Sequence, residues 1–484
     1  MGVTVATGAR SPFTLGAEQR ERLRARIELA LQRARRSGRA TLATMACPLP
    51  TAMDPSAVVC ASRRAGEPWF CFEQPDRGTA LGALGETLCL QARGSERFAS
   101  VADRWRALAA SAVADSPGDP DGGGPIVVGG FSFAPDGGGS PVWRGFAPAS
   151  MSVPELALVR ETLAGQTRSR LLLAALASPD DTAEELLARL AARASELRQA
   201  PLPLLDPAPT GSFQVASGMP PEHYEAAVAR AAELIGHGRI QKIVVARDVE
   251  VHAPSAYDPA ALLGVLREAF PSCFVFCVGR GDATLIAASP ELLVRRQGLR
   301  VSTIALAGST RRSADPAVDA HLGERLLRDP SYREEHAIVV RRIERTLNRY
   351  AIWVAAAREP TLARIANIQH LATPIRAQLA APIDAIELAG AMHPTPAVGG
   401  EPAAPALELI PALEGLDRGW YTGPVGWSDA AGDGEFCVAL RCALLRGKLA
   451  RCYAGNGIVR DSVPATELGE TEIKLAALLP LLSS

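Results

Sequence analysis

The order of the predicted elements from residue 242 onwards constrains the fold of this chain most. Five apolar segments are typical of strands, namely KIVVARDVEV, CFVFCVG, ATLIAAS, ELLVRR and LRVSTIAL. Two predicted helices follow at 317–329 and 332–350, then the strands GPVGW, EFCVALRCALL and LARCYAGNGIV, and a terminal helix over 466–482. Strands in consecutive runs, with helices grouped between them, favour an α+β fold with largely antiparallel sheets over a βαβ series. The sequence also lacks the glycine-rich loops of nucleotide-binding folds.

A proline-rich stretch at 201–212 predicts the main boundary in the chain, because proline interrupts both helices and strands. It separates residues 1–212 from residues 213–484. The first part mixes helical Arg/Ala/Leu patterns, at 17–38 and 181–199, with short apolar strands such as IVVGGFSF. It carries no motif that suggests chemistry. We therefore expect it to support a catalytic part over 213–484 and to pack into the same fold.

Composition excludes several classes of protein. The 51 basic and 52 acidic residues give a net charge of −1, which argues against general binding of nucleic acid. No apolar run reaches the roughly 18 to 20 residues of a membrane span, and the N-terminus has no apolar core of the kind a secretory signal needs. Nine cysteines without paired spacing are typical of reduced thiols. We expect a cytoplasmic protein without nucleic-acid or membrane partners.

The predicted terminal helix places charges on a face that should be apolar. Glu467, Glu470 and Lys474 follow one another at i, i+3 and i+7, so they share one side of the helix. The same stripe continues with three apolar residues, Ala477, Leu478 and Leu481. Buried charges are costly unless they are paired or bind a metal. The alternative is an ordinary surface pair between Glu470 and Lys474, which contributes only a few tenths of a kcal/mol.

Glu335 shows the same pattern on another predicted helix. It lies at helical spacings from Ile338, Val339 and Ile343, so it faces the apolar side, whereas Glu334 points elsewhere. A single inward carboxylate is usually half of a buried salt bridge. Three carboxylates on two helices could hold a divalent cation. Since the seven histidines do not cluster and no C-x-x-C pair occurs, such a metal would be a hard ion such as Mg²⁺.

Seven motifs identify a family resemblance. In order along the chain they are SPELLVRR (289–296), ALAGS (305–309), HPTPAVGG (393–400), YTGPVGW (421–427), ALRC (439–442), AGNGIV (454–459) and E-x-x-E-x-x-x-K (467–474). Together they resemble the chorismate-utilising enzymes, which include anthranilate, aminodeoxychorismate, salicylate and isochorismate synthases. The resemblance runs from about residue 215 to residue 484 and is loose over the first 200 residues.

The resemblance implies an α+β fold in which two large antiparallel sheets enclose the active site and helices cover the outside. It also implies Mg²⁺ and chorismate as ligands. Glu335 and Glu470 match the metal ligands, with Glu467 assisting directly or through water. Arg441 and Tyr421 match positions that hold the enolpyruvyl carboxylate of the substrate. A planar guanidinium suits that role because it grips a carboxylate with two hydrogen bonds, although an arginine on a strand is more often part of a structural ion pair.

Five further residues complete the substrate site that the resemblance implies. Gly457 would supply a backbone N–H to the enolpyruvyl carboxylate. Four others would contact substrate: Gly308, His370, Ala397 and Lys474. Taken alone, His370 would more often be a core histidine. Ala397 stands where salicylate-forming members carry threonine, which favours an enzyme that stops at isochorismate.

Two residues would carry the chemistry. Lys242 matches the lysine that activates water in water-adding members, where anthranilate-type members carry glutamine. Glu291 matches the general acid that protonates the departing C4 hydroxyl. Ala307 stands where aminodeoxychorismate synthases place a nucleophilic lysine, which closes that covalent route. Without the resemblance, Lys242 and Glu291 would pass for ordinary residues at strand ends.

The sequence therefore predicts a magnesium-dependent isochorismate synthase that needs no glutaminase partner. Salicylate synthase, which goes on to eliminate pyruvate, is the first alternative. An anthranilate synthase component is less favoured, because Lys242 does not match it. A non-catalytic chorismate-binding protein would have no use for both a base and an acid. The choice between menaquinone and siderophore biosynthesis stays open.

Overall fold

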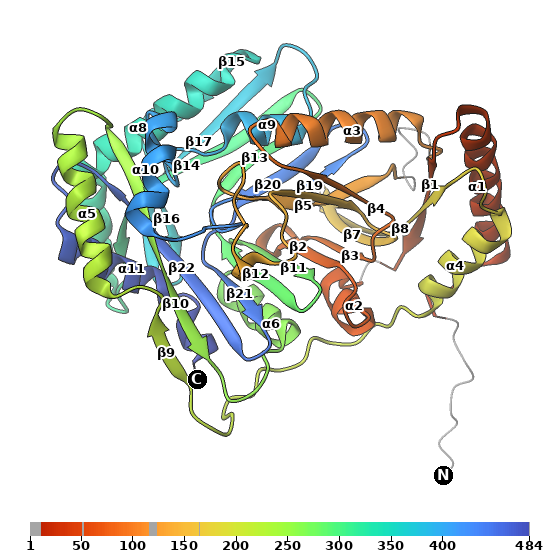
Figure 1. The fold of residues 1–484 in the computed structure, drawn as a ribbon, viewed down its shortest axis with the longest axis horizontal. Helices are drawn as coiled ribbons and strands as arrows, with labels where there is room; N and C mark the ends of the chain where they lie inside the picture. The colour runs from red at the N-terminus through yellow and green to blue at the C-terminus, as the bar shows by residue number, and fades with distance from the viewer. Residues whose placement is uncertain (1–10, 51–52, 116–122, 164, 484) are drawn as a thin grey trace.

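The computed structural model describes residues 11–50, 53–115, 123–163 and 165–483. Every pairing between named strands is antiparallel, and the strands form two sheets, one of twelve strands and one of ten. Helices cover the outer faces, with α1 and α4 at one end of the molecule and α5 and α11 at the other (Figure 1). The predicted α+β fold with two large antiparallel sheets is confirmed.

The twelve-stranded sheet, sheet A, takes its strands from both halves of the chain. In spatial order they are β1 (Thr41–Leu49), β8 (Gln166–Ala177), β7 (Leu156–Leu163), β3 (Thr79–Leu84), β2 (Trp69–Gln74), β11 (Phe274–Arg280), β12 (Ala283–Ser289), β21 (Cys442–Arg446), β22 (Leu449–Ile458), β10 (Lys242–His252) and β18 (Gly400–Glu401), with β9 (Gln214–Ser217) paired to β10.

The ten-stranded sheet, sheet B, is assembled in the same way. Its order is β15 (Ala351–Ala356), β17 (Ile368–Leu379), β14 (Arg300–Arg311), β13 (Leu292–Gln297), β20 (Gly434–Val438), β19 (Pro424–Asp429), β5 (Ile126–Phe131), β6 (Ala149–Val153) and β4 (Leu88–Ala92), with β16 (Thr361–Ile365) paired to β17. Strands from residues 1–212 thus lie in both sheets. β2 pairs with β11, and β5 pairs with β19.

The helices share a simple start signal. Asp-Pro begins four of them, because the aspartate accepts a backbone N–H of the first turn and proline is preset for the first helical position. These four are α2 (Pro55–Ser62), α6 (Pro259–Ala269), α7 (Pro316–Arg328) and α8 (Pro330–Leu347). The other helices of the described residues are α1 (Ala17–Ser37), α3 (Arg97–Ser111), α4 (Ala183–Ser195), α5 (Pro221–Gly236), α9 (Ala385–Met392), α10 (Ala403–Glu414), α11 (Pro464–Leu475) and α12 (Leu479–Leu482).

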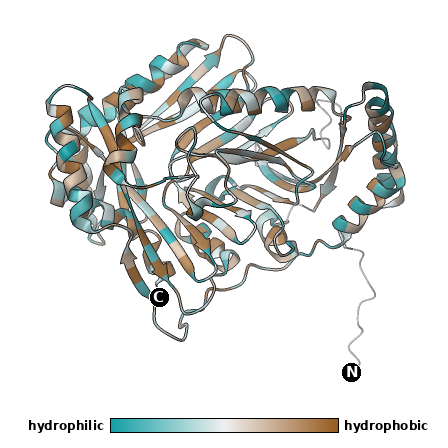
Figure 2. Ribbon diagram, viewed as in Figure 1, coloured by the Kyte–Doolittle hydropathy of each residue, from teal (hydrophilic) through white to brown (hydrophobic). Residues whose placement is uncertain are grey.

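The core lies between the two sheets and between each sheet and its helices. Phe72 and Phe276 of sheet A pack in one cluster with Val425 and Cys437 of sheet B. A second cluster joins sheet B to α3 and α9. Figure 2 shows the same division, with apolar residues along the strands and polar residues on the outward sides of the helices. The described cysteines, all nine, are free, as expected.

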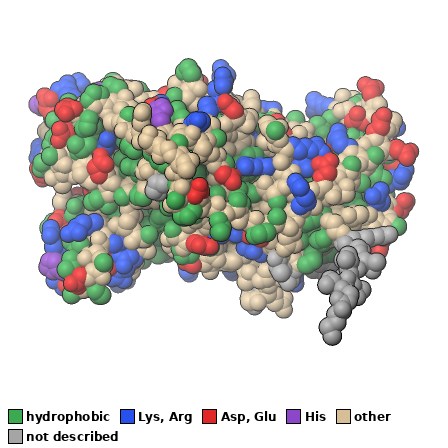
Figure 3. Space-filling model, turned by 90° about the horizontal axis from the view of Figure 1, so that it is seen from below, with side chains coloured by type: hydrophobic (Ala, Val, Ile, Leu, Met, Phe, Trp, Pro, Cys, Tyr) green, Lys and Arg blue, Asp and Glu red, His purple; other side chains and the backbone are tan. Residues whose placement is uncertain are grey.

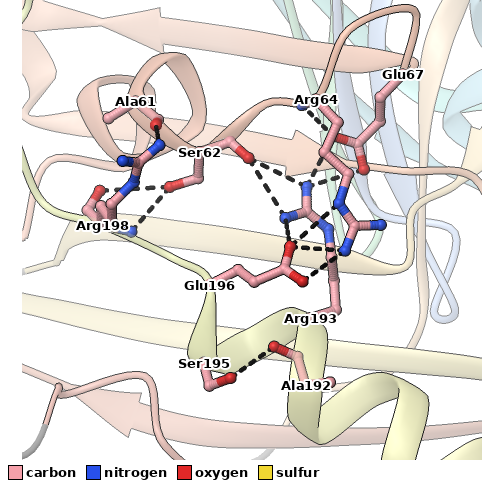
Figure 4. Close-up of polar contacts among 9 residues, drawn as sticks. All are labelled: Ala61, Ser62, Arg64, Glu67, Ala192, Arg193, Ser195, Glu196 and Arg198. Atoms are coloured by element: carbon pink, nitrogen blue, oxygen red, sulfur yellow. Dashed lines mark hydrogen bonds and ion pairs between the residues drawn. The ribbon is translucent and has the colours of Figure 1, made fainter.

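Two ion pairs, one buried and one exposed, tie helix α4 to the segment between α2 and β2. Arg193, at the end of α4, is only 2% exposed and donates to both carboxylate oxygens of Glu67, at 2.8 and 2.7 Å. Arg64 forms a matching forked pair with Glu196, so α4 is tied to the segment that follows α2 (Figure 4). Such paired guanidinium–carboxylate contacts fix geometry as well as charge. This network is structural, since all its charges neutralise one another.

Two predicted elements differ from the structure. The segment EFCVALRCALL forms two strands instead of one: β20 belongs to sheet B and β21 to sheet A, so the chain crosses between the sheets at 439–441. The predicted helix over 466–482 ends at Leu475 and a short helix, α12, follows it. Pro480 explains that break, because its ring would clash with the carbonyl of Ala476 in a continuous helix. The apolar residues 477 and 478 are buried but do not continue the face of α11.

The surface agrees with the balanced composition. On the face shown in Figure 3, acidic and basic side chains are interspersed, so this face has no large patch of one charge. Within the described residues, no helix combines the length and the apolar character that crossing a bilayer would require.

Candidate active site

A cavity of about 260 Å³ opens between the ends of β10, β14 and β22 and the helices α8 and α11. Eleven of the twelve residues proposed from the sequence line it: Lys242, Glu291, Gly308, Glu335, His370, Ala397, Arg441, Gly457, Glu467, Glu470 and Lys474. Ala307 and Ser309, of the ALAGS motif, are also on its wall. Residues separated by more than 200 positions in the sequence therefore meet at one site.

Tyr421 is the exception. Its ring lies in the aromatic core between the sheets, stacked on Tyr453 with the ring centroids 5.0 Å apart. It is not among the residues that line the cavity. Tyr421 therefore packs against Tyr453 in the core, a contact that its sequence motif did not indicate.

Lys242 is the first residue of β10 and is only 1% exposed. Its ammonium Nζ lies 2.8 Å from Oε1 of Glu335, which α8 supplies. A buried ammonium needs such a partner, because desolvation without pairing is costly. Gly457 makes the pair possible. A Cβ at that position would lie 2.5 Å from Glu335 Oε1 and 2.5 Å from Lys242 Cε.

Glu291 lies where the chain passes from β12 in sheet A to β13 in sheet B. Its backbone is fixed on both sides, since its N–H donates to Ser289 Oγ at 3.3 Å and its carbonyl accepts the Val438 N–H at 3.0 Å. The Thr395 hydroxyl donates to Oε1 of the carboxyl at 3.5 Å. Burial raises the pKa of Glu291 to about 7, although Lys242 and Arg441 act in the opposite direction. A carboxyl with this pKa can hold a proton near neutral pH and deliver it.

Arg441 lies at the second crossing, between β20 and β21, with a φ of 47°. This left-handed conformation is uncommon for a residue other than glycine and is associated with functional sites. Its guanidinium Nη2 donates to His370 Nε2 at 3.0 Å, so that ring nitrogen carries no proton. Burial, together with the charge of Arg441, lowers the pKa of His370 well below its usual value, in agreement with a neutral ring.

Gly308 forms a bulge in β14. Its φ is +72°, and the pairing of β14 with β17 shifts between Ala307 and Ser309. The bulge turns the Ser309 hydroxyl towards α11, where it donates to Glu470 Oε1 at 2.5 Å. Glycine is needed here because it tolerates a positive φ without strain.

The carboxylates of α11 face the cavity as expected. Burial acts to raise the pKa of Glu470, but Lys474 at 2.8 Å and the Ser309 bond outweigh it and hold the pKa below its usual value. Glu467 differs, because burial and repulsion from Glu470 raise its pKa to about 7. The i,i+4 pair of Glu470 and Lys474 does form, but on the cavity wall and not on an open surface.

The cavity carboxylates can form only part of the coordination shell of a divalent cation. Within the described ranges, no three carboxylate, histidine or cysteine side chains are grouped closely enough to hold an ion alone. Mg²⁺ usually takes one or two carboxylates and completes its shell with water and ligand oxygens. Burial raises the pKa of Glu467 most, and the repulsion from Glu470 that adds to it is of the kind that a cation relieves. Glu335, Glu467 and Glu470 therefore fit Mg²⁺ as part of its shell.

Several residues on or beside the wall were not found from the sequence. Asp329, Tyr332 and Asp461 line the cavity, and Asn456 bonds to Glu467 and Lys474. Asp329 caps α8, and its Asp-Pro signal is visible in the sequence. Asn456 gives no comparable signal, because its partners on α11 are known only once β22 and α11 are packed together.

Comparison with known proteins places this chain in a family. The family model described as chorismate binding enzyme matches residues 29–483. The chain belongs to the chorismate-binding enzyme family. It is 38% identical to the salicylate biosynthesis isochorismate synthase of Pseudomonas aeruginosa, over 89% of this chain and 88% of that protein. It is 31% identical to isochorismate synthase MenF of Bacillus subtilis, over 85% and 87% of the two chains.

Solved structures of this chorismate-binding family agree with the fold. The menaquinone-specific isochorismate synthase MenF of Escherichia coli superposes with a TM-score of 0.75 and 25% identity, over 94% of this chain and 99% of that one. The family relationship thus extends over the N-terminal strands, where the sequence motifs alone gave only a loose resemblance.

Proposed function

We propose that this protein is an isochorismate synthase that converts chorismate to isochorismate with Mg²⁺ bound at Glu335, Glu470 and Glu467. The observation that carries the proposal is that one cavity is lined by both a buried lysine, Lys242, and a buried carboxyl, Glu291, whose pKa is raised to about 7. A base and an acid are what the addition of water at C2 and the loss of hydroxyl at C4 require. The names of the similar proteins support the same reaction.

The chemical steps follow from these two groups. Lys242 first gives up its ammonium proton to solvent, and the neutral amine then takes a proton from a water molecule as the water oxygen bonds to C2 of the ring. The ring double bonds shift, the bond between C4 and its oxygen breaks, and Glu291 gives that oxygen a proton. Water is consumed and water is released, so the net reaction is an isomerisation. General acid and general base groups each contribute about 10²- to 10⁴-fold in rate. Solvent then restores both protonation states.

The charge of the cavity supports a bound cation. Six carboxyl groups line it, from Glu291, Glu335, Glu467, Glu470, Asp329 and Asp461, against three cationic side chains, from Lys242, Arg441 and Lys474. Lys242 and Lys474 are already paired with carboxylates, so Arg441 is the cation on this lining that is left for a dianionic substrate. Bound Mg²⁺ would supply the missing positive charge and ligate a substrate carboxylate. Arg441 would hold the other carboxylate with its planar guanidinium.

Ala307 and Ala397 support the choice of reaction. Both line the cavity, and neither can act as a nucleophile. The wall therefore offers no amine at 307 to form a covalent adduct, and water is left as the attacking group. A reaction with water needs no glutaminase to deliver ammonia, so we propose that chorismate is the partner of the chain and that no such subunit is required.

Product analysis tests the proposal. Purified protein is incubated with chorismate and Mg²⁺, and the products are separated by chromatography and identified by mass and absorbance. We expect isochorismate, no reaction after removal of divalent ions with EDTA, and recovery on addition of Mg²⁺. Salicylate together with pyruvate would support salicylate synthase instead. The Pseudomonas relative is named for salicylate biosynthesis, which makes this the alternative to test. Unchanged chorismate in the presence of Mg²⁺ would refute both.

A further inference from the structure

The side chain of Asn456 connects two residues on the cavity wall. It lies on β22, opposite Val245 of β10, and is 2% exposed. Its Nδ2 donates to the backbone carbonyl of Glu467 at 2.6 Å and to Glu467 Oε2 at 3.0 Å. Its Oδ1 accepts a hydrogen bond from Lys474 Nζ at 2.6 Å. Both hydrogens and the oxygen of the amide are therefore in use.

The polarity of this arrangement allows only one orientation of the amide. An ammonium group only donates, and the backbone carbonyl of Glu467 only accepts. The oxygen end must therefore face Lys474 and the nitrogen end must face Glu467. An aspartate at this position would lack the donor, and an apolar side chain would lack both the donor and the acceptor. Asn456 thus provides both the donor that Glu467 needs and the acceptor that Lys474 needs.

Lys474, whose ammonium is positioned by Asn456, in turn bonds to Glu470. Its three N–H donors meet three acceptors: Asn456 Oδ1, the Gly455 carbonyl at 3.0 Å and Glu470 Oε1 at 2.8 Å. An ammonium has no fourth donor, so contact with substrate would require Lys474 to give up one of these bonds. In this geometry Lys474 holds the Glu470 carboxylate in place through its ion pair with Oε1. The Ser309 hydroxyl donates to the same Oε1, and both bonds fix the direction of the carboxylate.

We propose that Asn456 is a positioning residue that sets the directions of the Glu467 and Glu470 carboxylates, the first directly and the second through Lys474. The inference rests on the proposed function, because it takes these carboxylates to receive a divalent cation. Groups that orient metal ligands in this way typically change metal affinity or activity by 10- to 100-fold when they are removed. The competing explanation is purely structural, namely that Asn456 ties α11 to sheet A.

Asn367 provides a matched control. Its Nδ2 donates to the carbonyl of Ile473 at 2.6 Å, so it also ties α11 to the rest of the molecule through one backbone bond. It is not among the residues that line the cavity and bonds to neither carboxylate. A loss of helix anchoring alone would affect the two alanine variants alike. A loss of carboxylate orientation would affect only the change at 456.

The experiment titrates Mn²⁺ into the purified full chain without chorismate and follows free Mn²⁺ by electron paramagnetic resonance, alongside the Tm without metal. We expect Asn456→Ala to raise the Kd for Mn²⁺ by 10- to 100-fold. Asn367→Ala should leave the Kd within twofold of the unmodified protein. Asn456→Leu, which keeps the number and branching of the side-chain heavy atoms, should shift the Kd like the alanine variant and serves if Asn456→Ala does not fold.

Three outcomes would overturn the inference: an unchanged Kd in the Asn456 variants, an equal rise in Kd in Asn367→Ala, or no binding of Mn²⁺ by the unmodified protein. None of these measurements includes turnover. A failure of the proposed function appears instead as unchanged chorismate in the product analysis. The two failures are therefore distinguished by separate readouts.

Discussion

Glu291 and Arg441 occupy two adjacent points at which the chain passes between the sheets. Glu291 follows β12 and precedes β13, and Arg441 follows β20 and precedes β21, while β12 pairs with β21 and β13 pairs with β20. Backbone bonds join the crossings, from Val438 N–H to the Glu291 carbonyl and from Ala288 N–H to the Arg441 carbonyl. The acid and the cation are therefore held by backbone that two sheets fix, which is the rigidity that a catalytic geometry requires.

The first prediction concerns the protonation of Glu291. Its pKa is raised from an ordinary 4.5 to about 7, so it holds its proton at pH 6 and has lost most of it by pH 8. Because the acid must be protonated to act, kcat/KM for chorismate should fall as the pH rises through about 7. Glu291→Gln should lower kcat by about 10²- to 10⁴-fold and remove this dependence from the residual rate. A pH profile in which the variant keeps the same decline would contradict the assignment.

The second prediction concerns Lys242 as the base. Lys242→Ala should lower kcat by about 10²- to 10⁴-fold, because the variant lacks the amine that we propose takes the proton from the attacking water. Lys448→Ala is the matched control, since that lysine is exposed and, among the described residues, its ammonium group bonds only to the Pro254 carbonyl. Steady-state turnover of both variants checks this. Unchanged turnover in Lys242→Ala would remove the base from the mechanism.

A third prediction uses the space around Gly457. In Gly457→Ala the new Cβ would approach Glu335 Oε1 and Lys242 Cε to 2.5 Å, so the ion pair must move apart. We expect a loss of kcat of at least tenfold, because a shift of about 1 Å at a reacting group can cost 10²-fold. Gly469→Ala makes the same change on an exposed position of α11, where a Cβ meets nothing within 4 Å. It should raise stability by roughly 0.5–1 kcal/mol and leave kcat unaffected.

A fourth prediction separates the shape of Arg441 from its charge. Arg441→Lys keeps a positive charge but replaces a planar fork of donors by a single ammonium. If the guanidinium grips a carboxylate with two bonds, the loss of one charged hydrogen bond, about 1.5–3 kcal/mol, should raise KM by roughly 10- to 150-fold. Measurement of KM and kcat in the variant tests this. A KM equal to that of the unmodified protein would show that charge alone is sufficient.

The sequence predicted which residues line the cavity better than it predicted how the chain runs between the two sheets to bring them together. The helical spacing of Glu467, Glu470 and Lys474 indicated a shared face, and all three line the cavity. EFCVALRCALL, in contrast, shows no sign that it spans two sheets, because its residues on both sides of the crossing are apolar and buried. The left-handed conformation at Arg441 is imposed by that crossing and not by the local sequence. Long-range packing likewise determines the contacts of Asn456.

In each sheet the strands from residues 1–212 form one block that meets the later strands at a single junction, and this has a consequence for truncated forms of the protein. A fragment starting at residue 213 would keep every proposed catalytic group but would lose β2 beside β11 and β5 beside β19. Each of β11 and β19 would then present one unpaired backbone edge to solvent, which is a template for self-association. We expect such a fragment to aggregate when it is expressed alone, so that the N-terminal 212 residues are needed for solubility even though they contribute no side chain to the reaction.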